Sequence, residues 1–136
     1  MAQVIEINSK VYKKPIQIKL YLYDTVSEMR KYMISKGEKK KRAKEVAAFF
    51  MYKGTYKGKT LQLGSIHFPK KYAKIKYITH EVAHAVRAYI LMDTQDMIDY
   101  VSGFGGYADE MAAYLTGDLN HLIFKELEKK GWHTAS

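Results

Sequence analysis

The sequence predicts an α+β fold in which a small, mostly antiparallel sheet packs on two long helices. The first half of the 136-residue chain has four segments rich in β-branched and aromatic residues, most of them alternating apolar with polar positions, as strands do. The second half has two long segments with apolar residues every three or four positions, as helices do. Because no repeat or linker divides the chain, we expect residues 1–136 to form a single domain.

The N-terminal third is expected to form two strands and one helix. The stretches QVIEIN and IQIKLYLY alternate apolar and polar residues. Asp24 or Thr25 can cap the helix, which ends before Gly37, and Glu28 completes a capping box with Thr25. The two strands are expected at residues 3–8 and 16–23.

A hairpin is expected next. Residues 46–52 (VAAFFMY) form a short continuous apolar stretch, which favours a buried strand. Residues 53–59 contain two glycines and are expected to be the turn. Residues 60–68 (TLQLGSIHF) then return as an alternating strand.

The C-terminal half is expected to be helical. Helical spacing of apolar residues covers residues 71–92 and 107–130. Between them, Asp93 or Thr94 caps a short helix to about Val101, which the glycine-rich SGFGG segment ends. The last helix has an acidic first turn, which the helix dipole favours.

Composition excludes several classes of protein. With no cysteine, the chain has no disulfide and no thiolate metal site, so any metal must be held by His, Asp or Glu. The N-terminus does not have the pattern of a signal peptide, and no apolar stretch is long enough to cross a membrane. We therefore expect a cytoplasmic protein without a membrane partner.

The formal charge of +9 is unevenly distributed. Residues 36–44 and 53–59 are strongly basic, whereas residues 93–118 contain no Lys or Arg. Such asymmetry indicates either a solvated loop and a protected sheet edge or a surface that contacts nucleic acid. The candidate nucleic-acid contacts are Lys39, Lys40, Lys41, Arg42 and Lys44.

The segment YITHEVAHAV, residues 77–86, places two histidines and a glutamate in an apolar helix. Residues four apart lie about 6 Å apart on one helix face, so His80 and His84 can present two imidazole nitrogens to a single ion. Glu81 lies about 100° around the helix from His80, where it can reach a water bound by that ion. Zinc lowers the pKa of such a water to about 7, and Glu81 can accept its proton. The pattern predicts a zinc-dependent hydrolase.

A catalytic zinc site needs a third protein ligand and one open position. Arg87 and Ile90 stand where the longer HExxHxxGxxH pattern has its glycine and third histidine, so that pattern is excluded. Glu110 is the favoured third ligand, because it begins the next long helix, which the glycine-rich loop lets fold back across the first. In the alternative interpretation it is a surface carboxylate favoured by the helix dipole. Asp109 is the nearest competitor, followed by Asp93, Asp99, Asp118 and His121.

HEVAH followed by DEMAAYLTGDL resembles the gluzincin group of zinc metallopeptidases, and more narrowly small phage and prophage metallopeptidase-like proteins. The resemblance covers about residues 60–120 and implies a minimal zincin-like domain, with Glu81 as general base. It also implies that residues 60–68 are the edge strand along which an extended peptide adds. The implied zinc ligands are His80, His84 and Glu110.

Other polar residues receive weaker assignments. Tyr114 lies one turn beyond Glu110 on the same helix face and can stabilise an oxyanion, although a packed core tyrosine is the commoner role. Tyr107 and His121 are further candidates for that role. His67 and His133 have no partner in the sequence and receive no role.

Together these features predict a zinc metallopeptidase, which hydrolyses peptide bonds in a peptide or protein. If the chain is phage-encoded, it would act in the host cytoplasm, and its substrate can be one dedicated partner such as a repressor or a host defence protein. The alternative is a basic module that binds nucleic acid or protein, in which the metal is structural or the motif is vestigial. Imidazole and carboxylate ligands also accept other divalent ions.

Overall fold

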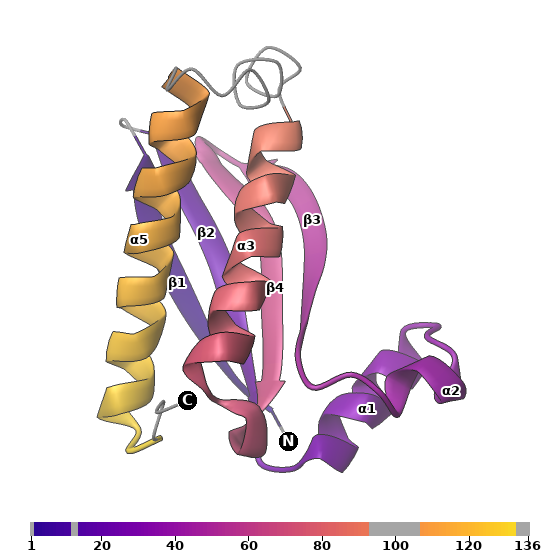
Figure 1. Ribbon diagram of the computed structural model, residues 1–136. Coiled ribbons are helices and arrows are strands. Elements are labelled where there is room, and N and C mark those ends of the chain that lie inside the picture. Colours follow the sequence, from indigo (N-terminus) through magenta and orange to yellow (C-terminus); the bar gives the residue numbers. More distant parts are fainter. Residues whose placement is uncertain (1, 12–13, 93–106, 133–136) are drawn as a thin grey trace.

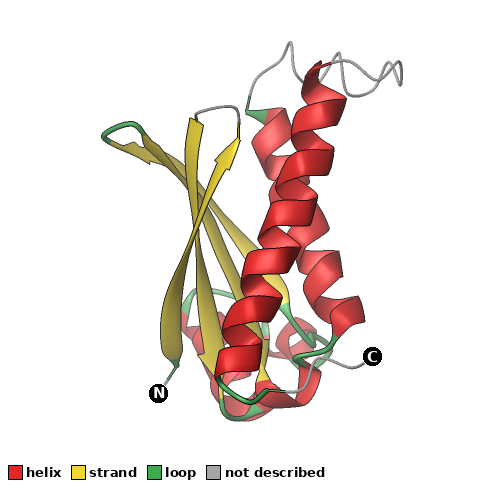
Figure 2. Cartoon of the chain, turned by 90° about the vertical axis from the view of Figure 1, so that its left-hand side faces the viewer, coloured by secondary structure: helices red, strands yellow, loops and turns green. Residues whose placement is uncertain are grey.

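The computed structural model describes residues 2–11, 14–92 and 107–132. Two antiparallel helices cover one face of a four-stranded sheet (Figures 1 and 2), so the α+β class is confirmed. The strands are β1 (Gln3–Val11), β2 (Lys14–Tyr23), β3 (Phe49–Lys57) and β4 (Thr60–Pro69). The helices are α1 (Val26–Ser35), α2 (Lys40–Ala43), the 3₁₀ helix η1 (Lys70–Tyr72), α3 (Ile75–Leu91) and α5 (Tyr107–Lys129).

The strand order is β1-β2-β4-β3, which agrees with a mostly antiparallel sheet but corrects the expected edge strand. β1 with β2 and β3 with β4 are antiparallel, but β2 pairs with β4 in parallel, so the sheet is mixed. Residues 60–68 belong to an internal strand and not to the edge, which β3 occupies. The chain between β2 and β3 passes through α1 and α2, and a connection of this length permits β4 to pair with β2 in parallel. Burial agrees, because β4 ends in four consecutive buried residues whereas β3 is half-buried to exposed.

The β3–β4 hairpin is longer than expected. β3 continues through Lys57, and the turn consists of Gly58 and Lys59 alone, so the expected turn at 53–59 is wrong. Gly54 has a φ of 66° and lies where the register shifts between Tyr52 and Thr55. Gly54 therefore marks a β-bulge within β3. A residue with a side chain would be strained at this positive φ.

The core lies between the sheet and the pair α3 and α5. Strand alternation sends every second residue of β2 towards the helices, and the apolar stripes of both helices meet them, as the periodicity predicts. Two polar contacts also join α5 to β1: Ser9 Oγ donates to Asp118 Oδ2 at 2.5 Å, and Lys130 Nζ donates to Gln3 Oε1 at 2.5 Å. Fully buried core side chains include Ile16, Ile18, Leu20, Ile78, Val82, Leu115, Leu119 and Ile123.

α1 covers one end of the opposite sheet face. It begins with the expected cap, in which the Glu28 N–H donates to Thr25 Oγ1 at 3.2 Å. Met29 and Met33 are its buried residues. The short helix α2, which follows α1, was not expected from the sequence.

His67 of β4 lies fully buried beneath α1, between aromatic rings. Its ring centre is 4.3 Å from those of Tyr21 and Phe49 and 5.2 Å from that of Tyr32. Tyr23 Oη is 2.9 Å from Nδ1, and Ser65 Oγ is 2.7 Å from Nε2, so both ring nitrogens have a partner. Burial lowers the pKa of His67 to about 3, which keeps the imidazole neutral.

Two further expectations concern the helices. α3 begins at Ile75 and not near residue 71, because η1 and the extended Lys74 precede it. The short helix expected after Asp93 lies outside the described residues. Within the described ranges, no helix has the length and apolar character needed to cross a membrane.

Candidate active site

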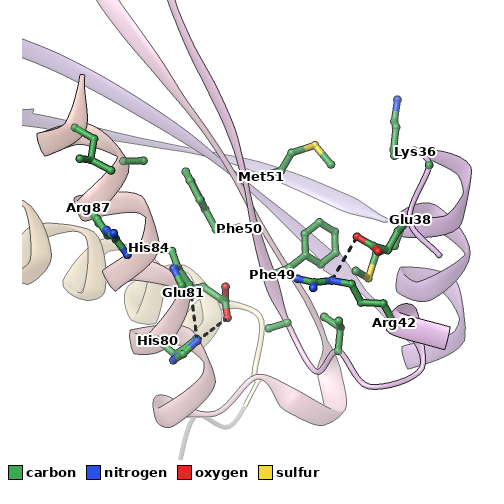
Figure 3. Close-up of a pocket in the computed structure, with 16 residues that line it drawn as sticks. Lys36, Glu38, Arg42, Phe49, Phe50, Met51, His80, Glu81, His84 and Arg87 are labelled. Atoms are coloured by element: carbon green, nitrogen blue, oxygen red, sulfur yellow. Dashed lines mark hydrogen bonds and ion pairs between the residues drawn. The ribbon is translucent and has the colours of Figure 1, made fainter. Parts of the chain in front are cut away.

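The HExxH segment lies in the N-terminal half of α3, where helix packing decides the direction of each side chain. Ile78 and Val82 are buried against the sheet. Glu81 lies at the margin of this buried face and is only 6% exposed. His80 and His84 lie on the solvent side of the same helix, and their rings point into an open cleft (Figure 3).

The two histidines converge on one point. His80 Nε2 and His84 Nε2 are 3.2 Å apart, and their ring planes meet at 81°. Two nitrogens bound to one tetrahedral zinc ion at about 2.0–2.1 Å would lie roughly 3.3 Å apart. The spacing therefore fits two ligands of a shared ion, as the four-residue separation predicts.

Glu81 lies beside this pair and also against the edge strand. Its Oε2 is 4.0 Å from His80 Nε2. Burial raises the pKa of the Glu81 carboxyl to about 7, and a hydrogen bond from the backbone of Phe50 partly opposes this shift. The carboxyl thus lies where α3 meets β3, within reach of any group held by the histidines.

The cleft at this site has a volume of about 780 Å³ and three walls. The exposed side of α3 forms the first, the edge strand β3 the second, and the segment from the end of α1 through α2 the third (Figure 3). Labelled lining residues are Lys36, Glu38, Arg42, Phe49, Phe50, Met51 and Arg87, besides the HExxH residues.

The sequence interpretation missed the third wall and Arg87. Arg87 could have been found, because a residue three positions after His84 lies on the adjoining helix face. No sequence pattern indicated the third wall, because residues 36–42 are distant from α3 along the chain and only the tertiary fold brings them to the cleft.

The predicted third ligand, Glu110, belongs to the first turn of α5. It is exposed there, as expected for a carboxylate favoured by the helix dipole. Within residues 2–11, 14–92 and 107–132, no group of three or more His, Asp or Glu side chains is arranged to hold a metal. The structure thus brings His80 and His84 together but does not add Glu110 to them.

Of the remaining candidates, the structure describes the side chains of Tyr114, Asp118 and His121, and none of these three lines the cleft at the histidine pair. Tyr114 is 55% exposed and is absent from the described lining of the cleft. Asp118 bonds to Ser9 of β1, and His121 is exposed on α5. The side chains of Tyr107 and Asp109, and all of Asp93 and Asp99, lie outside the described residues.

Comparisons of this chain with protein-family models, with curated proteins and with solved structures found no match.

Proposed function

We propose that the protein is a zinc-dependent metallopeptidase with a zincin-like arrangement of its active helix and edge strand. The observation that carries the proposal is the convergence of His80 Nε2 and His84 Nε2 at 3.2 Å, with the Glu81 carboxyl 4.0 Å from the first of them. The same spacing suits a hydrogen bond between the two rings in the absence of metal, so the HExxH order and the carboxyl of Glu81 beside the pair support the proposal together with the distance.

Each residue has a distinct task in this proposal. His80 and His84 hold the ion, which when bound supplies a Lewis acid that polarises a peptide carbonyl and acidifies water. Glu81 accepts the proton of the attacking water and passes it to the leaving amine. Its contact with Phe50 keeps the carboxyl at the edge of β3, where an extended peptide can lie beside the strand.

The third ligand remains a prediction. The sequence favours Glu110, and its neighbour Asp109 offers a matched control on the same helical turn. We expect Glu110→Gln to weaken zinc binding by at least about tenfold and Asp109→Asn to leave it unchanged. If both variants bind zinc as the wild type does, the ligand set must be completed by another group.

The test of the function compares the wild type with Glu81→Gln. We expect the purified protein to bind one zinc ion and to cleave members of a peptide library. Glu81→Gln should retain zinc but cleave about 10²–10⁴-fold more slowly, because it lacks the general base. A chelator should abolish cleavage, and added zinc should restore it. A protein without zinc affinity, or a Glu81→Gln variant of full activity, would contradict the proposal.

A second candidate function is nucleic-acid binding. The observation that favours it is the short helix α2 and its flanks, which expose five basic side chains in succession apart from the buried Ala43. These are Lys39, Lys40, Lys41, Arg42 and Lys44.

Phosphate contacts make binding steeply dependent on salt, so a salt titration with single- and double-stranded DNA and RNA tests this candidate. We expect Lys40→Gln with Lys41→Gln to reduce the salt slope by about 2 if α2 contacts phosphates. Lack of binding at low salt would remove this function.

A further inference from the structure

The cleft beside the HExxH helix has more basic than acidic groups. Arg87 lies on the α3 wall, and Lys36 and Arg42 lie on the wall formed by α1 and α2 (Figure 3). The carboxylates among the described lining residues are Glu38 and Glu81. The histidines and any metal they hold add no negative charge, so the excess of positive charge belongs to the site itself.

The partners of these cations show which of them are available to a ligand. Arg42 Nε is 3.6 Å from Oε2 of the half-buried Glu38, so this carboxylate of the cleft already has a cationic partner. Lys36 Nζ lies 5.6 Å from the ring centre of Tyr32, and it makes no ion pair with the described residues. Arg87 is exposed, and within the described part of the chain it makes no ion pair. Among the described residues, no carboxylate pairs with the Arg87 guanidinium in the cleft.

The position of Arg87 relates it directly to the histidines. It follows His84 by three residues, which places it about 4.5 Å further along the helix axis and roughly 60° around it. This offset lies between one and two residue spacings of an extended chain, which rises about 3.3 Å per residue. A peptide bond at His80 and His84 would thus bring a neighbouring substrate side chain within reach of the guanidinium.

The rest of the cleft fits an extended peptide. β3 is an edge strand, so one side of its backbone has no strand partner among the described residues. Phe50 and Met51 of β3, with Ala88 and Leu91 of α3, supply apolar lining around the charged groups. When a peptide adds to a sheet edge as an extra strand, hydrogen bonds between the two backbones give affinity, and pockets for its side chains give specificity.

We propose that the cleft binds an extended peptide that carries an acidic side chain next to the residues at His80 and His84, and that Arg87 is the specificity-determining residue. This inference rests on the proposed function, because it assigns the substrate class of the same site. A guanidinium recognises a carboxylate through two parallel hydrogen bonds, which distinguishes it from the isosteric amide.

The experiment measures binding separately from cleavage. Fluorescent octapeptide pools, identical except for one position fixed as Glu, Gln or Lys, are titrated against zinc-loaded Glu81→Gln and against Glu81→Gln carrying Arg87→Gln. The fixed position is moved along the peptide from pool to pool. We expect one position at which the Glu pool binds at least about tenfold more tightly than the Gln pool, and Arg87→Gln should abolish this preference. Arg87→Glu should transfer the preference to the Lys pool.

Lys125→Gln is the matched control, because it removes the same charge from an exposed site on α5 outside the described lining of the cleft. It should leave the preference unchanged. The proposal is overturned if Glu and Gln pools bind equally at every position, or if Arg87→Gln retains the preference. It is also overturned if Lys125→Gln abolishes the preference equally, or if a single-stranded oligonucleotide displaces the Glu pool and binds more tightly.

The two proposals can fail separately. If the wild type cleaves peptides without regard to acidic residues, the specificity inference fails and the peptidase stands. If the Glu pool is bound through Arg87 but the wild type cleaves nothing, the peptidase fails, and the cleft remains a binding site for acidic peptides.

Discussion

Two histidine environments of this molecule differ in almost every physical property. His67 is fully buried under α1, and both of its ring nitrogens are hydrogen-bonded. His80 and His84 are exposed, and the nitrogens of the two rings face one another at 3.2 Å. α3 packs on one face of the sheet (Figure 2), whereas His67 stacks with Tyr21, Tyr32 and Phe49 beneath α1.

The residue type alone therefore does not distinguish a buried, hydrogen-bonded histidine from one that is available to a ligand. His67 has the shape of an aromatic core residue whose polar atoms are satisfied, so it contributes to folding. The rings of His80 and His84 share one hydrogen-bonding contact and otherwise face solvent in a cleft. They therefore contribute little to folding and remain available to a ligand. Substitutions at the two sites should therefore affect different measurements.

The largest expected effect is on metal binding. His80→Ala should weaken zinc affinity by at least about 100-fold, because each ligand contributes roughly 3 kcal/mol. The free energy of unfolding without metal should change by no more than about 0.5 kcal/mol, because the side chain is exposed. Isothermal titration with zinc and urea denaturation measure the two quantities. The matched control is His121→Ala on α5, and equal zinc affinity in both variants would contradict the distinction.

The next effect is on stability. His67→Ala should lower the free energy of unfolding by about 3 kcal/mol, because it leaves a cavity and removes the partner of the buried Tyr23 hydroxyl. Urea denaturation measures this loss. Zinc affinity of the folded variant should stay within about twofold of the wild type. A loss below about 1 kcal/mol would mean that the aromatic cluster repacks without the imidazole.

The imidazole of His67 should also make the free energy of unfolding depend on pH. The pKa of His67 is lowered from 6.5 to about 3 in the folded state, so the unfolded state takes up its proton first. Its contribution is fully present above pH 6.5 and is lost as the pH falls towards 3, by about 1.4 kcal/mol per pH unit. The stability difference between the wild type and His67→Gln, measured from pH 7 to pH 4, isolates it. A difference that does not change with pH would disprove this assignment.

The smallest effect concerns the helix that covers His67. Thr25→Ala should lower the free energy of unfolding by about 0.5–1 kcal/mol, because the Glu28 N–H loses its acceptor at the start of α1. Thr25→Ser keeps the hydroxyl and should stay within a few tenths of a kcal/mol of the wild type. Thermal unfolding of the three proteins compares them. If both variants are equally destabilised, the methyl group matters and the cap does not.

The elements themselves were largely predictable, because their signals are local. Thr25 with Glu28 predicted the cap of α1, and the apolar spacing that continues to Leu127 predicted α5. The expected turn at 53–59 failed because a glycine marks a bulge as readily as a turn, and only pairing with β4 distinguishes them. The position of β3 at the edge also depended on pairing, since no residue of β3 specifies its neighbour.

By itself the sequence determined the convergence of His80 and His84 and the position of Glu81 beside them, because helix geometry fixes residues that are one and four positions apart. Only the tertiary structure decided that Glu81 is buried against β3 and that residues 36–42 face Arg87 across a cleft. Those relations join segments distant along the chain, and sheet order and helix packing determine them.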